Sequence, residues 1–131
     1  MTEPTRQGTG TIAAVALSVL AAAGLLGCAP SEPVVFGDAD HGKIVILRDA
    51  CGSCHAIPGI SLADGAVGPP LAGFGQRTMI AGVLPNRPEN LEQWLRDPQR
   101  FAPGSAMPAD TLNDQEARDA AAYLESLGSP A

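Results

Sequence analysis

The sequence predicts a small all-α domain, and three observations support this prediction. Apolar residues recur at helical spacing around Leu91 and again between residues 117 and 127, which is the pattern of helices with one buried face. No segment shows the two-residue alternation of a half-buried strand. The chain has 131 residues, a length that holds one domain, or one domain with a tail.

Composition limits the classes of function that the chain could have. Asp and Glu number 14 against 8 Lys and Arg, and the formal net charge is -6. A nucleic-acid-binding protein needs a basic face that displaces the counterions of the phosphates, so this charge balance argues against a nucleic-acid partner. The 3 cysteines are an odd number, which a simple set of disulfides does not use up.

Residues 1–27 are predicted to be an export signal. No charged residue occurs from Gln7 to Ser31, and a short polar start containing Arg6 precedes the apolar stretch. The unbroken apolar part is about 16 residues long, which is shorter than the ~20 residues that a membrane-spanning helix needs. A secretory signal is therefore favoured over an uncleaved transmembrane anchor.

The end of this segment, Leu25-Leu26-Gly27-Cys28, resembles the signal of a bacterial lipoprotein. The resemblance implies that Cys28 is lipidated and becomes the mature N-terminus. An uncleaved anchor and a plain secreted form are the alternatives. All three place the rest of the chain in the bacterial cell envelope, on the periplasmic or outer face of the cytoplasmic membrane. Residues 28–38 then form a polar tether that contains proline.

The first helix is expected from about Ala39 to Ala50. Asp38 precedes it and is the expected N-cap, because its carboxylate can accept hydrogen bonds from the free N–H groups of the first turn. His41, near the start of this helix, is interpreted as a solvated surface residue. The helix leads directly into Cys51.

The segment Cys51-Gly52-Ser53-Cys54-His55 has the pattern C-x-x-C-H, the attachment signal for c-type haem. Two thiols on one helical turn can add across two vinyl groups of a porphyrin, and the imidazole that follows is placed as the proximal iron ligand. One haem c, held covalently through Cys51 and Cys54 and ligated by His55, is therefore the predicted cofactor. The chain has only 3 Phe, 1 Trp and 1 Tyr, and a porphyrin would supply the apolar bulk that its core lacks.

A cysteine pair of this spacing can also form a redox-active site or bind a structural zinc ion. A thioredoxin-like redox pair would require a surrounding βαβ pattern, and the sequence shows none. A structural zinc site would require a second pair of ligands, but the only other histidine is His41. Both are weaker interpretations of the motif.

The second helix is expected from about Pro88 to Arg96. Leu91, Trp94 and Leu95 follow the i, i+3, i+4 spacing of a buried stripe. Pro98 is expected to end the helix, because proline cannot continue the hydrogen-bond ladder of a helix interior.

Met107 is the predicted distal ligand of the iron. Met1 is lost with the signal, and the neighbours of Met79 indicate ordinary packing. Met107 lies between Pro103 and Pro108 in a stiff loop that can hold its thioether at one place. The alternative is that Met107 is a loop residue packed on the core. Iron held by histidine and methionine is typical of an electron carrier with a raised potential, whereas iron held by histidine alone can bind small molecules.

The third helix has the clearest boundaries in the sequence. Asn113 is the expected N-cap, Glu116 completes a capping box, and Gly128 stops the helix. Residues 129–131 form a short tail. The inner face is expected to contain Ala117, Ala120, Ala121, Leu124 and Leu127.

Residues 39–128 resemble a class I cytochrome c domain with a single haem. Besides C-x-x-C-H, the chain contains Gly68-Pro69-Pro70-Leu71, which is similar to the G-P-x-L turn that packs behind the proximal histidine in this family. The resemblance implies that the carbonyl of Pro69 accepts the Nδ1–H of His55 and that Leu71 belongs to the haem site. It also implies three main helices wrapped around one haem, with the first and last helices crossing.

The segment from Trp94 to Met107 is similar to the family pattern that leads into the distal loop. The resemblance therefore assigns Trp94 and Leu95 to the distal pocket. Arg77 falls where the family places an arginine near a haem propionate, with an ordinary surface arginine as the alternative. One departure is the run Ile44–Leu47, because the family commonly has an aromatic residue in the first helix.

The amino-acid sequence of residues 81–91 looks most like that of the cytochrome c domain fused to subunit II of some bacterial haem–copper oxidases. The chain has no copper-site motif, however. The resemblance implies a membrane-anchored electron carrier, not an enzyme, that delivers one electron at a time to a terminal oxidase. Its donor would be an upstream cytochrome complex or dehydrogenase, and it would have no small-molecule substrate. The alternatives are a haem peroxidase or gas-sensing protein with an open distal site, and a cytochrome subunit of a periplasmic dehydrogenase.

Overall fold

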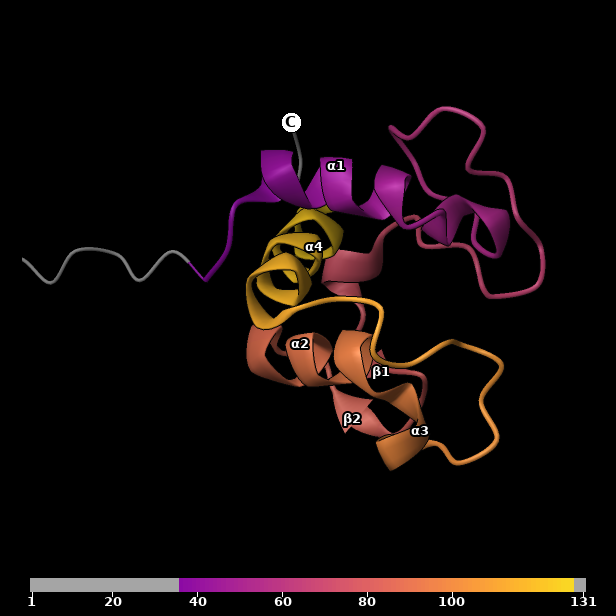
Figure 1. The fold of residues 1–131 in the computed structure, drawn as a ribbon, viewed down its shortest axis with the longest axis vertical. Coiled ribbons are helices and arrows are strands. Elements are labelled where there is room, and N and C mark those ends of the chain that lie inside the picture. The colour runs from indigo at the N-terminus through magenta and orange to yellow at the C-terminus, as the bar shows by residue number, and fades with distance from the viewer. Residues whose placement is uncertain (1–35, 129–131) are drawn as a thin grey trace, which may run out of the picture. The chain divides into compact units, whose positions relative to one another are not determined.

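The computed structural model describes residues 36–128, so the predicted signal, Cys28, most of the tether and the tail lie outside the described residues. Four α-helices occur in this part of the chain: α1 (Ala39–Arg48), α2 (Pro88–Arg96), α3 (Pro98–Phe101) and α4 (Asp114–Ser126). Two 3-10 turns, η1 (Cys51–Ser53) and η2 (Phe74–Gln76), and two short strands, β1 (Met79–Ile80) and β2 (Leu84–Pro85), complete it. The prediction of an all-α domain is confirmed (Figure 1).

The predicted helix starts are confirmed by their caps. The Asp38 carboxylate accepts hydrogen bonds from the N–H groups of Asp40 (2.9 Å) and His41 (3.0 Å) at the start of α1. At the start of α4, the Asn113 side chain accepts from the Glu116 N–H at 3.0 Å, and the Glu116 carboxylate accepts from the Asn113 N–H at 2.9 Å. These capping hydrogen bonds join residues only two or three positions apart, so they could be predicted from the sequence.

The structure corrects one predicted boundary and adds a short helix and a strand pair that were not predicted. Helix α1 ends at Arg48, two residues before the predicted end, because Ala50 adopts a left-handed conformation with φ 52° that turns the chain into η1. Pro98 follows the end of α2, as predicted, but it is also the first residue of α3, because its fixed φ suits the first turn of a helix. The antiparallel pair β1–β2, with Ile80 opposite Leu84, was not predicted, because strands of two residues are too short to show a period.

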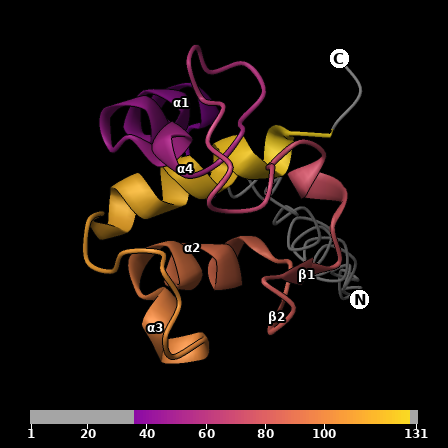
Figure 2. The same ribbon diagram turned by 90° about the vertical axis from the view of Figure 1, so that its right-hand side faces the viewer.

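Helix α4 lies between α1 and α2 and packs against both (Figures 1 and 2). Its inner face is as predicted: Ala117, Ala120, Ala121 and Leu124 are buried, and Leu127 is half-buried. The small alanines let the neighbouring backbones approach closely. The first and last helices therefore cross, as the resemblance implied.

The crossing of α1 and α4 depends on Gly42. A Cβ atom at this position would lie 1.9 Å from the backbone oxygen of Asp119, so the two backbones are in direct contact. Ile46, one turn further along α1, is buried in the core. It belongs to the run Ile44–Leu47, in which no aromatic residue occurs.

His41 differs from its predicted role as a solvated residue. Its Nδ1 lies 2.6 Å from a carboxylate oxygen of Asp119, which is only 2% exposed, although the imidazole itself is half-exposed. Asp119 also accepts hydrogen bonds from the Asp38 N–H and the Gln115 amide, both at 2.8 Å. Burial alone would raise the pKa of Asp119, but these hydrogen bonds outweigh it and lower the pKa. The carboxylate thereby fastens the start of α1 to α4.

We expect Asp119→Asn to lower the free energy of unfolding at neutral pH by about 1–3 kcal/mol, because the amide loses the charge and one acceptor of a buried hydrogen-bonded group. A carboxyl group whose pKa is lowered by folding contributes stability above its ordinary pKa, which is 3.8 for Asp119, and that contribution is lost as the pH falls further. The difference between the two proteins should therefore shrink below pH ~4.

Urea unfolding of the holoprotein at several pH values measures this difference. Asp114→Asn is the matched control, because Asp114 lies on the same helix but its side chain is 62% exposed in an ion pair with Arg96. Equal effects of the two substitutions at neutral pH would contradict the assignment of Asp119 as a buried anchor.

Candidate functional site

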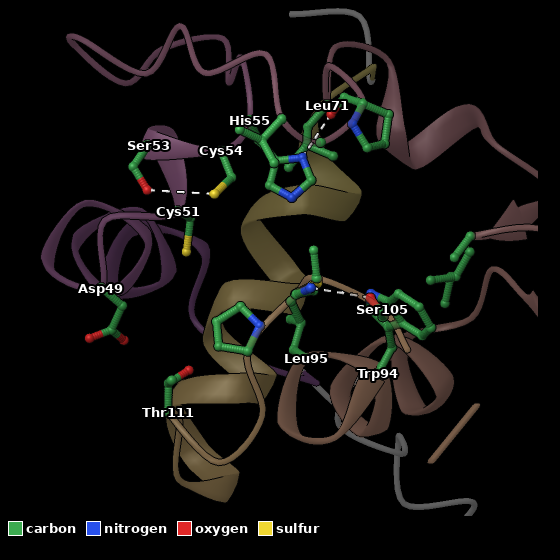
Figure 3. Close-up of a pocket in the computed structure, with 18 of the residues that line it drawn as sticks. Asp49, Cys51, Ser53, Cys54, His55, Leu71, Trp94, Leu95, Ser105 and Thr111 are labelled. Atoms are coloured by element: carbon green, nitrogen blue, oxygen red, sulfur yellow. Dashed lines mark hydrogen bonds between the residues drawn. The ribbon is translucent and has the colours of Figure 1, made fainter. Parts of the chain in front are cut away.

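The C-x-x-C-H motif folds as the tight turn η1 and the residues that follow it. The N–H groups of Cys54 (3.2 Å) and His55 (3.1 Å) both donate to the Cys51 carbonyl. Cys51 and Cys54 are free cysteines. The turn places both thiols and the imidazole of His55 at the same side of one cavity (Figure 3).

The electrostatic environment of Cys51 is that of an unactivated thiol. Burial raises its pKa, and the negative charge of Asp49 raises it further. Redox-active cysteines have a lowered pKa, because the thiolate is their reactive form. Cys51 therefore lacks the activation of a redox-active thiol, in agreement with the absence of a βαβ unit in the described part of the chain.

The turn Gly68–Leu71 fixes the orientation of His55. The Nδ1 of His55 lies 2.8 Å from the carbonyl oxygen of Pro69. Because a carbonyl can only accept, Nδ1 carries the hydrogen, and Nε2 has a free lone pair that can ligate a metal ion. This is the hydrogen bond that the resemblance implied.

Gly68 and its neighbours hold this turn close against the imidazole. A Cβ atom at Gly68 would lie 2.3 Å from the ring carbon Cε1 of His55, so a side chain there would displace the ring. The Gly68 N–H donates to the Cys54 carbonyl (2.8 Å), and the Leu71 N–H donates to the Ala56 carbonyl (2.8 Å). The motif and the turn are therefore joined by backbone hydrogen bonds on both sides of His55.

The cavity in front of His55 has a volume of about 500 Å³. In Figure 3, Cys51, Cys54, His55 and Leu71 lie on one side, and Trp94, Leu95, Ser105 and Thr111 on the other. A second cavity of about 70 Å³ shares several lining residues with the first, including His55, Leu71 and Met107, and extends to core residues of α1 and α4. Both cavities are walled mainly by apolar side chains.

Of the two methionines in the described part of the chain, only Met107 lines the cavity. It is half-buried, and its N–H donates to the Ser105 hydroxyl at 3.2 Å. Met79 lies on β1 with 41% of its surface exposed and does not line the cavity, so it is not placed as a ligand. Met107 remains the candidate for a ligand on the side opposite His55.

Arg77 also lines the cavity and is held by its surroundings. Its guanidinium donates to the carbonyls of Pro70 (2.5 Å) and Ala72 (3.3 Å), and it lies 5.3 Å from the centre of the Phe74 ring. A fixed positive charge at a cavity wall suits an anionic group of a ligand. Its role toward a propionate stays a prediction.

The sequence did not identify several residues of the cavity wall. They lie outside the three predicted helices, in segments without a period, so no spacing pattern marked them. No cluster of three or more His, Cys, Asp or Glu side chains suited to a metal ion occurs among residues 36–128. The unpredicted wall residues include Phe74, Ile80, Ala81, Ala102 and Leu112.

The site fits a covalently bound haem. Two free thiols on one turn match two vinyl groups, and the free Nε2 of His55 and the thioether of Met107 are iron ligands of the expected kinds. The volume falls within the range of ~300–1,000 Å³ typical of cavities for organic ligands. The geometry of the donor set thus agrees with the cofactor that the motif predicts.

Comparison with known proteins gives the following matches. A family model described as Cytochrome c matches residues 39–128. Cytochrome c oxidase subunit 2 of Alkalihalophilus pseudofirmus is 41% identical over 90 residues, which are 68% of this chain and 25% of that protein. The subunit 2 of Bacillus subtilis is 38% identical over 93 residues, 68% of this chain and 26% of that protein. Cytochrome c4 of Stutzerimonas stutzeri is 31% identical over 121 residues, 86% of this chain and 50% of that protein. The chain therefore spans about a quarter of the length of the oxidase subunits that it matches.

Proposed function

Because this chain belongs to the cytochrome c family, we propose that it is a lipid-anchored electron carrier that delivers single electrons to a terminal oxidase. Family membership makes it an electron-transfer haem protein of the class I cytochrome c fold. The anchor, the partner and the roles of individual residues belong to the proposal.

One observation carries the proposal: a single apolar cavity has the cysteine pair and His55 on one side and Met107 in its lining. The Pro69 carbonyl keeps the Nε2 lone pair of His55 free, and Leu71, Trp94 and Leu95 give the cavity apolar walls. When bound, the haem supplies a one-electron couple, and a histidine–methionine ligand pair gives it a raised potential. If His55 and Met107 both ligated the iron, no open coordination position would be left for a substrate, which favours a carrier over a peroxidase or gas sensor.

The names of the similar proteins support an oxidase as the electron acceptor. The A. pseudofirmus and B. subtilis proteins are both named cytochrome c oxidase subunit 2, and the match covers about a quarter of each. We propose that this chain presents a related domain to a terminal oxidase. An upstream cytochrome complex or dehydrogenase would reduce it.

A lipid on Cys28 would keep the domain close to the membrane. The ten residues from Ala29 to Asp38 that follow Cys28 span at most ~33 Å when fully extended. Within residues 36–128, none of the helices has the length and apolar character needed to cross a bilayer. The intact mass of the protein isolated from membranes should show the added masses of one haem and one lipid, and a mass without lipid would contradict the anchor.

We expect the reduced protein to be oxidised rapidly by membranes that contain the terminal oxidase, and to bind carbon monoxide poorly because Met107 occupies the distal position. Stopped-flow absorption spectroscopy of the haem measures both reactions. Ready binding of carbon monoxide without oxidation by the membranes would identify an open-site haem protein instead. Rapid reduction by a periplasmic dehydrogenase, without oxidation by the membranes, would identify a subunit of that dehydrogenase.

A further inference from the structure

The segment that carries Met107, residues 102–108, is irregular and mostly exposed. Its backbone is tied down at both ends. The Ala102 N–H donates to the Pro98 carbonyl at 2.9 Å before the methionine, and the Asp110 N–H donates to the Arg96 carbonyl at 2.8 Å after it. The contacts that hold the middle of the segment, next to Met107, therefore decide where the thioether lies.

Gln99, in the first turn of α3, supplies these contacts. Its side-chain oxygen accepts from the Gly104 N–H at 2.9 Å. Its side-chain nitrogen donates to the carbonyls of Ser105 (2.5 Å) and Met107 (3.3 Å). One partly buried amide thus bonds three backbone groups of the segment, including one of Met107 itself.

The position of Gln99 is fixed by the fold and not by the cavity. Helix α3 is held by Asp97, whose carboxylate accepts from the Arg100 N–H at 3.1 Å. Gln99 does not line the cavity, so its amide acts from behind the loop. Ser105 extends the contact, because its hydroxyl accepts the Met107 N–H at 3.2 Å while its carbonyl is held by Gln99.

We propose that Gln99 is a positioning residue that holds the 102–108 segment in the conformation in which Met107 reaches the iron. This inference rests on the proposed ligation by Met107. An amide is required because the segment offers both a donor and two acceptors, and only a side chain with both functions satisfies all three. Release of Met107 from the iron would then require the loss of these hydrogen bonds.

The experiment measures the affinity of imidazole for the ferric holoprotein, in which imidazole must displace Met107. For Gln99→Leu we expect imidazole to bind about tenfold to hundredfold more tightly than to the wild type, because the three hydrogen bonds of the amide no longer oppose opening of the loop. The near-infrared absorption of methionine-ligated ferric haem should weaken in parallel. Gln99→Glu keeps the size and the acceptor but places a carboxylate against two carbonyls, so it should shift the affinity in the same direction.

Gln93→Leu is the matched control. Gln93 is an exposed amide on α2 that donates only to the Glu89 carbonyl, in its own helix, so its replacement should leave imidazole binding unchanged. Circular dichroism and the thermal midpoint of each variant show whether the domain is folded. If Gln99→Leu proved unfolded, the result for Gln99→Glu would decide the matter.

Two outcomes separate this inference from the proposed function. If wild type and Met107→Ala bind imidazole equally well, Met107 is not a ligand, and the proposed ligation fails. If Met107→Ala binds imidazole more tightly than the wild type but both Gln99 variants bind it as the wild type does, ligation stands and the positioning role of Gln99 is overturned.

Discussion

Replacement of Met107 by alanine is expected to lower the reduction potential of the haem and to open a coordination position on the iron. A thioether favours ferrous over ferric iron, so its loss should lower the potential by on the order of 100 mV, within the ~0.8 V range over which axial ligands act. Met107 and His55 line the same cavity, as two ligands of one iron would have to.

Potentiometric titration and carbon monoxide binding to the reduced protein measure the two effects. Met79→Ala is the control, because Met79 is 41% exposed on β1 and does not line the cavity. An unchanged potential and unchanged ligand binding in Met107→Ala would show that another group, or none, holds the distal position. The closed-site mechanism of the proposed carrier would then be wrong.

The second large effect is expected at Gly42, where α1 crosses α4. In Gly42→Ala the new methyl group would lie 1.9 Å from the Asp119 backbone oxygen, so the helices must move apart. Overpacking of this kind costs about 3 kcal/mol, and the better helix propensity of alanine returns about 1 kcal/mol of it. A net loss of about 2 kcal/mol should lower the thermal midpoint of the holoprotein by about 8–16 °C.

Differential scanning calorimetry of the holoprotein measures this shift. Gly82→Ala is a useful control, because Gly82 has φ 74° but a Cβ atom there would meet nothing within 4 Å. Gly82→Ala introduces backbone strain without a steric clash, so its thermal midpoint should fall by less than that of Gly42→Ala. If both variants lost the same stability, direct contact between α1 and α4 would not be the cause at Gly42.

Prediction from the sequence succeeded where a signal is confined to a few neighbouring residues. The bounds of α2, the cap at Asp38 and the capping box of Asn113 and Glu116 were all identified in this way. The C-x-x-C-H motif is equally local, and the family match over residues 39–128 agrees with the prediction of a haem domain. These features could be predicted because their chemistry depends on spacing along the chain.

The sequence by itself determined three of the four helices and the haem attachment motif, and it offered Met107 as the candidate distal ligand. Only the tertiary structure decided which residues meet across the fold. The partly buried contact of His41 with Asp119 joins residues 78 positions apart. Gln99 lies close to Met107 in sequence, but its three hydrogen bonds depend on how an irregular loop folds back on α3. No hydrophobic periodicity or local motif predicts such contacts, because they form only once the packed fold has brought the partner groups within hydrogen-bonding distance.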